Sequence, residues 1–509
     1  MPQRHQTIPS AGGSAPHNPL SGTAGRVAVV DIGSNTVRLV VYDAPQMMPV
    51  PMFNEKAQCE LGRGLSETGK LNPEGVEEAF RSLARFIGLA EAMGVDDLEL
   101  VATAAVRDAK DGPDFVARLE KRFGLKINVL SGAEEARLAA LGLLSGVPEA
   151  DGFLGDLGGG SLDLVKLNRG SFGDTATLPL GHLRLTEDAD GETGKAPEII
   201  KKHLQTLTWL PEMEGRTLYA VGGSWRSIAR CFIEHTGYPI HVIDNYTINR
   251  KEALRLLQSI EGIGEKKITG IPRRRRRTMP FAALVMEALL KTALPREIVF
   301  SGFGMREGQL RKCIPDEVRN QDPLISGCMS LAARTGRFSI RGEEILDWMS
   351  PLFPEETPVE RRMRLAACLL SDIGWTEHPD YRAEHAFHRA LRIPFAGLTH
   401  QDRVLLSLAV FIRYNGDVDA KLVKPVRGIL NQRQLERIES IGLALRLAHT
   451  VSGSAPGLLS KTSLKVEGET LTLVLPENDE IFVSETIQRR FKTLALHFHL
   501  NNRISRREK

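Results

Sequence analysis

Two stretches of the chain place an aspartate beside a turn of small residues, with an apolar segment on each side. They read VAVVDIGSNTVRLVVYDAP (residues 27–45) and FLGDLGGGSLDLVKL (residues 153–167). When the two are aligned, Asp31 falls on Asp156 and Gly33 on Gly158. A single unit of this kind is typical of an ordinary hairpin. A repeated unit with the same chemistry predicts two similar lobes that share one site.

The second turn has the composition of a phosphate-binding site. Its three consecutive glycines carry no Cβ, so several backbone N–H groups can converge on one anion. Asp156 lies at the strand end and Asp163 follows across the bend, and Mg²⁺ prefers such carboxylate oxygens. The alternative is a glycine-rich hairpin with two solvated aspartates, but the duplication favours phosphate. The turn residues predicted to contact phosphate are Gly33, Ser34, Asn35, Thr36, Gly158, Gly159, Gly160 and Ser161.

A third turn of small residues lies further along the chain. Gly222, Gly223 and Ser224 separate an apolar strand-like segment from the helical segment WRSIARC. Because helix N-termini favour anions, this turn predicts a further phosphate contact. A plain strand-to-helix turn explains the same pattern nearly as well.

Composition narrows the function classes. The 509 residues include 66 basic and 63 acidic side chains, with a net charge of +3, so any anion site must be local. Five scattered cysteines form no CxxC pair, which indicates a reducing compartment. No apolar run reaches the ~20 residues of a membrane span, and residues 1–26 lack a signal-peptide core and predict a disordered arm. We expect a cytoplasmic protein with no membrane or specific nucleic-acid partner.

The order of strand-like and helical segments predicts the domain organisation. Alternating strands and helices indicate α/β lobes over residues 27–150 and 151–320. Helical segments dominate residues 321–450. The last part, residues 451–509, contains a predicted hairpin followed by a basic amphipathic stretch.

Five motifs together resemble the exopolyphosphatase / guanosine pentaphosphate phosphohydrolase (Ppx/GppA) family. They are VVDIGSNTVRL, VATAAVRDA, SGAEEARLA, DLGGGSLDLV and SGFGMREG. The resemblance implies an α/β fold of two ribonuclease-H-like lobes, of the actin, Hsp70 and sugar-kinase type, with the active site in the cleft between them. An all-α HD-like domain and a small C-terminal α/β segment would follow. Family members release terminal phosphate from inorganic polyphosphate, and often from guanosine pentaphosphate, with Mg²⁺; a homodimer is compatible with the resemblance.

The same motifs imply roles for five side chains. Glu135, in SGAEEA, takes the place of the catalytic general base, although the residues alone also suit a carboxylate that only favours a helix N-terminus. Asp156 becomes a metal-associated carboxylate. Asp163 replaces the family's glutamate and is shorter by one methylene, so a water-mediated metal contact is easier to accept than a direct one. Arg38 and Arg107 match arginines near the polyanion, whose charge a guanidinium can offset.

Two further segments carry charged or metal-ligating residue types. In the HD-like region Ser371 precedes Asp372 where a His-Asp pair is needed, and no histidine occurs between residues 301 and 377. We therefore expect a degenerate metal site there. The run Arg273–Arg277 is interpreted either as a solvated basic loop or as a patch that attracts polyphosphate, and the two interpretations are about equal.

The sequence therefore predicts a Mg²⁺-dependent exopolyphosphatase in which Glu135 activates water. Polyphosphate and guanosine penta- or tetraphosphate all present a chain of phosphates, so the preferred substrate stays open. The same residues also suit a kinase of this fold, or a non-catalytic sensor of alarmones or polyphosphate.

Overall fold

The computed structural model describes residues 25–43, 51–261, 273–335, 342–477, 480–482 and 484–506. The chain divides into two compact units, Met1–Asn320 and Gln321–Lys509. The expected disordered arm lies outside the described residues, apart from its last two positions. No helix in the described ranges is long and apolar enough to cross a membrane.

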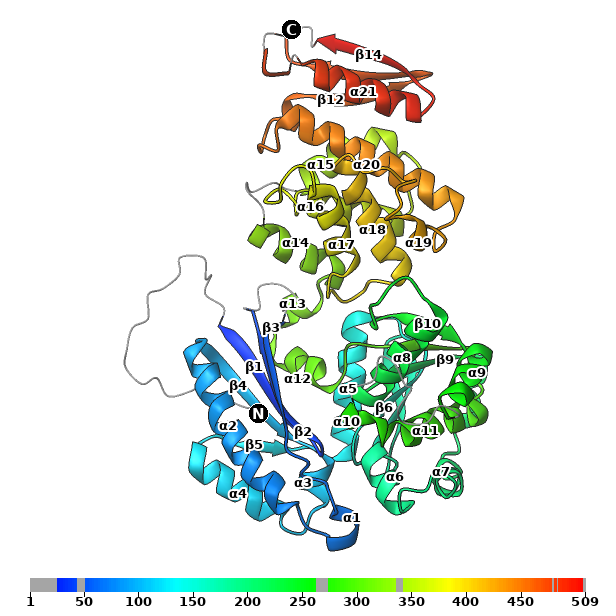
Figure 1. The fold of residues 1–509 in the computed structure, drawn as a ribbon. Helices are drawn as coiled ribbons and strands as arrows, with labels where there is room; N and C mark the ends of the chain where they lie inside the picture. The colour runs from blue at the N-terminus through cyan, green and yellow to red at the C-terminus, as the bar shows by residue number, and fades with distance from the viewer. Residues whose placement is uncertain are drawn as a thin grey trace. The chain divides into compact units, whose positions relative to one another are not determined.

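The first sheet of the N-terminal unit contains the first predicted hairpin (Figure 1). Its strands are β1 (Arg26–Ile32), β2 (Thr36–Tyr42), β3 (Pro51–Gln58), β4 (Val95–Ala102) and β5 (Ile127–Val129). They lie in the order β3-β2-β1-β4-β5. β1 pairs antiparallel with β2 and parallel with β4, so the hairpin prediction is confirmed. Short helices α1 (Leu65–Thr68) and α3 (Ala104–Asp108) and the longer α2 (Pro73–Ala92) and α4 (Gly112–Phe123) belong to this lobe.

The second sheet repeats the same central hairpin. Its order is β10-β11-β9-β6-β7-β8, and β6 pairs antiparallel with β7. The strands are β6 (Gly152–Leu157), β7 (Leu162–Asn168), β8 (Ser171–Leu178), β9 (Thr217–Val221), β10 (Tyr246–Asn249) and β11 (Glu297–Phe300). The helices of this lobe are α6 (His182–Asp188), α7 (Ala196–Leu204), α8 (Gly223–Thr236), α9 (Arg250–Glu261), α10 (Arg273–Arg276) and α11 (Met279–Thr292).

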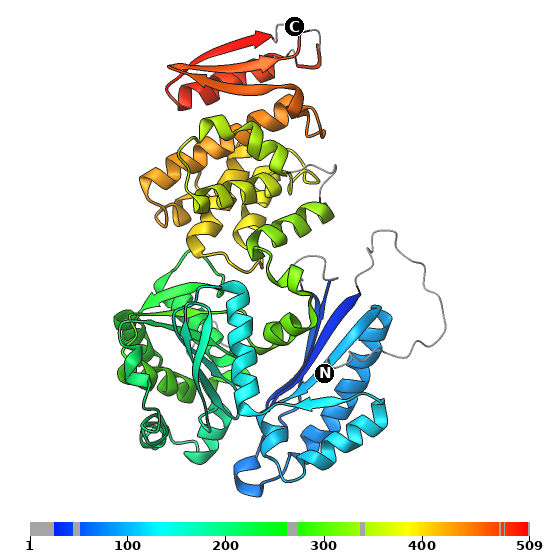
Figure 2. The ribbon, with the colours of Figure 1, turned by 180° about the vertical axis from the view of Figure 1, so that it is seen from behind.

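Two helices connect the lobes: α5 (Gly132–Gly146) and α12 (Met305–Cys313). α5 packs on β7 and β8 of the second sheet, while α12 packs on β1 of the first (Figure 2). The two helices also pack against each other at very short range. A Cβ at Gly142 would lie 1.9 Å from the carbonyl oxygen of Gly304, and a Cβ at Gly308 would lie 1.9 Å from that of Leu138. Glycine at both positions therefore permits the close crossing. The four-residue α13 (Asp316–Arg319) ends this unit.

The first sheet is buried on both faces, which explains the continuous apolar run of β1. Ala28, Val30 and Ile32 face a core that includes side chains of α2 and α4. Val27 and Val29 face the opposite way, into a core that includes side chains of α5 and α12. Asp31, the last residue but one of β1, is thereby held between buried neighbours of the two cores.

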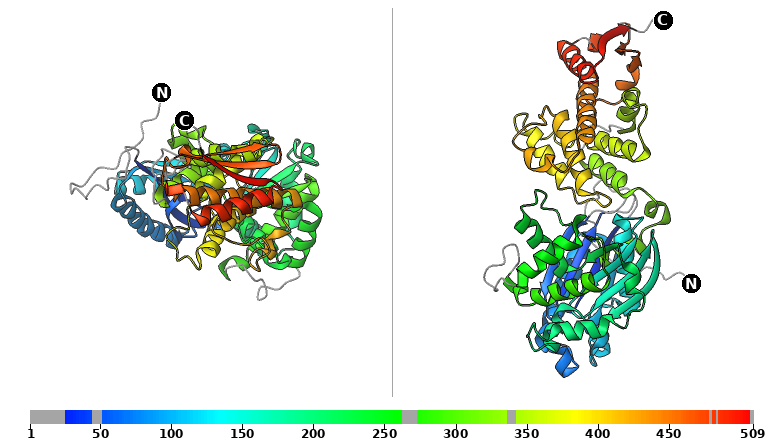
Figure 3. Two further views of the ribbon diagram at one scale, coloured as in Figure 1. Left: turned by 90° about the horizontal axis from the view of Figure 1, so that it is seen from above. Right: turned by 90° about the vertical axis from the view of Figure 1, so that its right-hand side faces the viewer.

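The C-terminal unit is mainly helical and ends in a small sheet (Figure 3). Its helices are α14 (Pro323–Thr335), α15 (Gly342–Trp348), α16 (Pro358–Leu370), α17 (Arg382–Leu391), α18 (His400–Arg413), α19 (Lys424–Arg427), α20 (Gln432–Ser452) and α21 (Glu485–His497). The long α20 packs between α18 and α21. The strands are β12 (Ser463–Glu467), β13 (Thr470–Leu475) and β14 (Asn501–Arg506), in the order β12-β13-β14. Two mixed α/β lobes, a helical region and a small sheet therefore confirm the predicted fold class.

The strands β3, β8 and β14 were not expected from the sequence. All three are edge strands with mainly exposed residues. They pair through the backbone and bury few side chains, so their sequences show little of the apolar alternation that marks a strand.

Candidate active site

The two hairpin turns face each other inside the N-terminal unit. Each turn closes with the same hydrogen bond: Gly33 donates to the Thr36 carbonyl at 3.0 Å, and Gly158 donates to the Ser161 carbonyl at 3.0 Å. A Cβ built on Gly159 would lie 3.1 Å from the Cβ of Ser34. The lobes therefore approach each other closely at their glycine-rich turns, where only small residues fit.

The start of α6 fixes the carbonyl groups of the second turn by hydrogen bonds. The backbone N–H groups of His182 and Leu183 donate to the carbonyls of Gly158 and Gly159 at 3.2 and 3.0 Å. Because the N–H of a trans peptide points opposite to its carbonyl, the amides of Gly159 and Gly160 are directed away from α6. In the described part of the chain these two amides have no hydrogen-bond acceptor. They form the start of an anion-binding nest.

A cavity of about 200 Å³ lies between the two turns. It brings together most of the residues predicted from the sequence. Those that line it are Gly33, Ser34, Asn35, Thr36, Arg38, Glu135, Asp156, Gly158, Gly159, Gly160, Ser161, Gly222, Gly223 and Ser224. Arg107 and Asp163 do not line this cavity, but each contacts a residue that does: Arg107 donates to Glu135, and Asp163 accepts from Ser161.

Gly222 is required by the third turn. It has φ +102°, a conformation that side chains rarely adopt, and a Cβ there would lie 2.5 Å from the Leu157 carbonyl oxygen. Gly222 is the N-cap of α8, whose first residues Gly223 and Ser224 line the cavity. The positive end of the helix dipole therefore adds to the two turns.

Glu135 is held by an arginine. Its Oε2 accepts a hydrogen bond from Nη1 of Arg107 at 3.0 Å, and the same nitrogen donates to the Leu130 carbonyl at 3.0 Å. Arg107 comes from the short helix α3, within the motif VATAAVRDA. Burial, and then the negative charge of Asp163, raise the pKa of the Glu135 carboxyl. A base with a pKa raised toward neutrality is suited to proton abstraction near pH 7.

Glu134, one residue earlier, has a different position. It points back to Ser131 and completes a capping box at the start of α5. Glu134 therefore caps the N-terminus of α5, and the neighbouring Glu135 lines the cavity.

Asp156 and Asp163 are direct partners across β6 and β7, so their side chains lie on the same face of the sheet. Burial, and then Asp163, raise the pKa of Asp156 to about 7. Asp163 is 2% exposed, and its carboxylate accepts hydrogen bonds from Thr177 Oγ1 at 2.7 Å and Ser161 Oγ at 3.2 Å. Asp156 is therefore the carboxylate that the cavity can reach, whereas Asp163 is held behind it by hydroxyl groups.

Several cavity residues were not singled out from the sequence, among them Arg226 and Arg306. Burial, and then the neighbouring Arg306, lower the pKa of Arg226 to about 10. Arg38 is affected in the same way, with a pKa of about 10. Cations that destabilise one another favour an anionic ligand between them. Arg306 lies in the motif SGFGMREG, which was a usable signal; Arg226, one turn into a helix after a glycine turn, was a weaker one. Lys56 and His182 are further lining residues that were not singled out from the sequence, whereas Asp31 and Arg275 come from segments that were.

The basic run contributes one arginine to the cavity. Residues Arg273–Arg276 form the short helix α10 and not a loop, and both interpretations of the run, a solvated basic segment or a patch that attracts polyphosphate, stay predictions. Arg275 lines the cavity and donates to the Gly223 carbonyl and to Ser227 Oγ, the latter at 2.8 Å. Arg277 is exposed beside an adjoining cavity. The side chains of Arg273 and Arg274 lie outside the described part of the structure.

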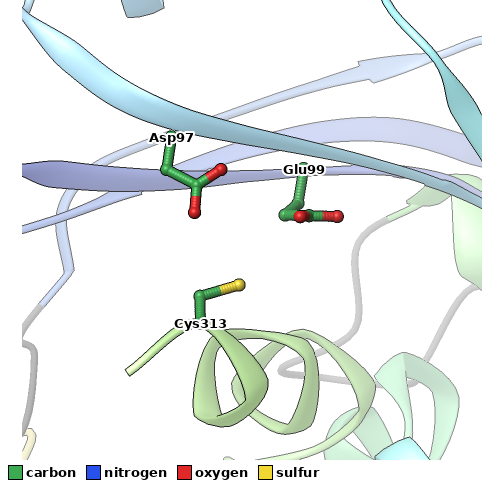
Figure 4. A group of neighbouring side chains, drawn as sticks. All are labelled: Asp97, Glu99 and Cys313. Atoms are coloured by element: carbon green, nitrogen blue, oxygen red, sulfur yellow. The ribbon is translucent and has the colours of Figure 1, made fainter. Parts of the chain in front are cut away.

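A separate group of three side chains lies at the C-terminal end of α12, whereas the N-terminal end of this helix carries Arg306 at the cavity. Asp97 and Glu99 project from β4 toward Cys313 (Figure 4), and their potential ligand atoms lie within 4.8 Å of one another. Burial and the two carboxylates raise the pKa of the Cys313 thiol to about 12, so without a metal the thiol is protonated near neutral pH. Gln309 donates to Glu99 at 3.2 Å. These contacts attach α12 to the first sheet.

In the C-terminal unit, ion pairs and hydrogen bonds engage the residues expected at a degenerate metal site. Arg413 donates to Asp372 at 3.0 Å, with both side chains nearly buried. Ser371 is bonded to His449 Nε2 at 2.7 Å, and the exposed His385 contacts Glu377 at 3.2 Å. Across the described residues, Asp97, Glu99 and Cys313 are the one group of three or more potential metal ligands whose ligand atoms lie within 4.8 Å of one another. At Asp372 the positive partner in the structure is the guanidinium of Arg413.

Comparison with known proteins agrees with this architecture. The chain matches the Ppx/GppA phosphatase family over residues 40–317 and the exopolyphosphatase C-terminal family over residues 324–499. It is similar to the Retrograde regulation protein 2 of Saccharomyces cerevisiae, with 26% identity over 77% of this chain and 73% of that protein. It is also similar to Exopolyphosphatase 1 of Mycobacterium tuberculosis, with 34% identity over 32% of this chain and 48% of that protein. The chain thus spans about half the length of the mycobacterial relative.

Two solved structures share the fold of the N-terminal part. One is the Ppx/GppA family member of Aquifex aeolicus, with a TM-score of 0.50 and 24% identity over 58% of this chain and 99% of that chain. The other is an exopolyphosphatase from Cytophaga hutchinsonii, with a TM-score of 0.53 and 23% identity over 57% of this chain and 97% of that chain. With more than half of its length matched and the glycine-rich turns in place, the chain belongs to the Ppx/GppA phosphatase family.

Proposed function

We propose that this protein is an exopolyphosphatase that removes the terminal phosphate of inorganic polyphosphate. The observation that carries the proposal is the charge of the cavity. Among the described residues, five cationic side chains and three carboxyl groups line it, and burial raises the pKa of the Asp31 and Asp156 carboxyls. The excess of positive charge and the turn amides together favour a phosphate chain.

Mg²⁺ fits the residues present. Asp156 is a buried carboxylate in the cavity, with a pKa raised to about 7, and a divalent cation would stabilise its charged form. Asp156 would hold the ion directly, and Asp163 through water. When bound, Mg²⁺ would neutralise part of the charge on the phosphate oxygens.

The protein's own residues supply the other parts of the reaction. Glu135 takes a proton from a water molecule, whose oxygen attacks the terminal phosphorus. The bond from that phosphorus to the bridging oxygen breaks, so orthophosphate and a chain shorter by one phosphate leave. Arg38, Arg226 and Arg306 offset the negative charge during this step. Arg107 contacts Glu135 and fixes its orientation.

The preferred substrate is the finer part of the proposal. Guanosine pentaphosphate presents a shorter phosphate chain and can enter the same cavity, so one enzyme can serve both substrates. A kinase of this fold would need an acceptor pocket beside the terminal phosphate. In the described lining, charged, hydroxyl and glycine residues predominate, which favours water as the acceptor.

A second candidate function is that of a non-catalytic polyphosphate sensor. The relative that covers 77% of this chain is named as a regulation protein. A sensor would bind polyphosphate and release no phosphate.

Phosphate release by the purified protein separates these functions. We expect the protein to release orthophosphate from polyphosphate, both with and without added guanosine pentaphosphate. This release should stop when Mg²⁺ is chelated. Binding of polyphosphate without release, at any Mg²⁺ concentration, would support the sensor. Phosphate transfer to an added alcohol or nucleotide would support the kinase.

A further inference from the structure

His182 is a histidine in the cavity wall that the reaction described above does not use. It is the first residue of α6, and its backbone holds the Gly158 carbonyl. Its side chain is 8% exposed and faces the active-site cavity. A buried histidine at this place is costly unless its ring meets a polar partner.

The two ring nitrogens of His182 differ in access. Nδ1 is sealed from solvent and has no hydrogen-bond partner in the described structure. Nε2 makes no hydrogen bond there either, and it is the nitrogen that a molecule in the cavity can reach. Burial, and then the charge of Arg275, lower the pKa of the His182 ring to about 4, so the ring is neutral at pH 7 and carries one N–H. A buried acceptor is tolerated better than a buried donor, which places the proton on Nε2.

His182 also stands where the active-site cavity meets a second one. The second cavity has a volume of about 180 Å³. The residues that line both cavities are Asn35, Gln58, His182 and Arg275. Arg277 lies further along the second cavity. In the other direction, toward a third cavity, Ser34 and Gly159 approach each other closely and narrow the passage. The second cavity is also lined by Glu60, Arg63 and Glu187, so three arginines and two glutamates face it. The junction at His182 therefore gives the phosphate chain a polar way out, with a small excess of positive charge.

We propose that His182 contacts the substrate directly. Its Nε2–H donates a hydrogen bond to the phosphate chain on the leaving side of the scissile bond, where the chain enters the second cavity. The inference rests on the proposed function, because it takes the terminal phosphate to lie near Glu135 and Asp156. A neutral donor at this point helps to hold the chain in register and keeps the leaving phosphate solvated.

Binding measurements without turnover test this contact. The Glu135→Gln variant is titrated calorimetrically with orthophosphate, tripolyphosphate and long polyphosphate. The same titrations are made with three double variants, in which Glu135→Gln is combined with His182→Phe, His182→Gln or His235→Ala. Phe keeps the ring volume without a donor, and Gln places an amide N–H near the position of Nε2. His235 is exposed at the end of α8 and serves as the matched control.

We expect His182→Phe to raise the Kd for tripolyphosphate and long polyphosphate about 5- to 10-fold, as for the loss of one hydrogen bond. The Kd for orthophosphate, which is too short to reach the junction, should stay within about twofold. His182→Gln should restore most of the affinity, and His235→Ala should have no effect. If polyphosphate binds equally well to His182→Phe, or if all three ligands weaken equally, the contact is refuted while the proposed function stands. If long polyphosphate does not bind the Glu135→Gln chain with His182 intact, both fail.

Discussion

Arg107 Nη1 and Glu135 Oε2 lie 3.0 Å apart, and this ion pair joins α3 of the first lobe to the helix that packs on the second sheet. Only 21% of the arginine side chain and 13% of the glutamate side chain are exposed. Burial opposes the charge on Glu135, and Arg107 supports it. The balance between Arg107 on one side and burial and the Asp163 charge on the other sets the pH at which the proposed base becomes active.

The first prediction concerns the base itself. Glu135→Gln should lower turnover of polyphosphate by at least ~10²-fold while leaving its binding intact, because the loss affects proton abstraction alone. Phosphate release and calorimetric binding measure the two effects. The matched control is Glu134→Gln, which loses part of the helix cap and should lose stability with turnover within a few-fold. Near-normal turnover by Glu135→Gln would show that another group is the base.

The second prediction uses pH. In the structure Arg107 lowers the pKa of Glu135, against the rise caused by burial. Arg107→Gln removes that support, so the pKa of Glu135 should rise further. The ionised base then forms at higher pH, and the limb of kcat/KM that increases with pH should move upward. Arg184→Gln is the control, since Arg184 also contacts Asp108, at 3.2 Å, without touching Glu135. An unchanged pH profile for Arg107→Gln would show that Arg107 does not influence the pKa of the catalytic base.

The third prediction links Asp156 to stability. Its pKa rises from 3.8 to about 7 on folding, so the folded protein binds the proton more tightly than the unfolded chain. Stability is therefore lost as the pH rises between these values. Without Mg²⁺ at about pH 8, Asp156→Asn should have a higher Tm than the unmodified chain, and the difference should narrow toward about pH 5. Added Mg²⁺ should raise the Tm of the unmodified chain more than that of the variant.

Asp174→Asn serves as its control, because Asp174 is exposed and lies 4.0 Å from Lys166. It should leave both the pH dependence and the Mg²⁺ dependence of Tm unchanged. An equal Mg²⁺ response in Asp156→Asn and the unmodified chain would exclude Asp156 as the metal carboxylate.

The fourth prediction concerns Arg277. It is exposed beside the second cavity, so Arg277→Gln should raise KM for long polyphosphate more than for guanosine pentaphosphate and leave kcat unchanged. The effect should shrink as added salt reduces the Debye length from ~10 Å at 0.1 M to ~3 Å at 1 M. Arg296→Gln, an exposed arginine on the segment before β11, is the control. Equal effects on both substrates at every salt concentration would show that the basic run is a solvated segment that does not attract polyphosphate.

The fifth prediction concerns the C-terminal unit. Asp372→Ala leaves the nearly buried Arg413 without its carboxylate, and breaking a buried pair costs about 3–5 kcal/mol. The variant should melt at a lower temperature, yet release phosphate within a few-fold of the unmodified chain per folded molecule. His385→Ala, which removes an exposed contact, should change neither. A stoichiometric transition metal in this unit, detected by elemental analysis, would contradict the degenerate site.

The sequence by itself determined the parts of the site that are local. The hairpin turns at Gly33 and Gly158 depend on residues that are adjacent in the chain, and Glu135 follows a Ser-Gly break that starts a helix. Short-range sterics and capping fix such features. The fold class followed from the same local patterns and from the resemblance.

Only the tertiary structure decided which further side chains reach the cavity. Arg226, Arg275 and Arg306 come from three separate helices, and His182 comes from a fourth. Their placement depends on how the lobes pack, including the close crossing of α5 and α12. Because packing joins residues that are far apart in the chain, neither the motif that contains Arg306 nor the basic run that contains Arg275 could by itself place these side chains at the cavity. For Asp156 and Asp163 the sequence and the structure both contribute. The sequence predicted a water-mediated metal contact for the shorter Asp163, and the structure adds that the hydroxyl groups of Ser161 and Thr177 bind its carboxylate behind the cavity wall.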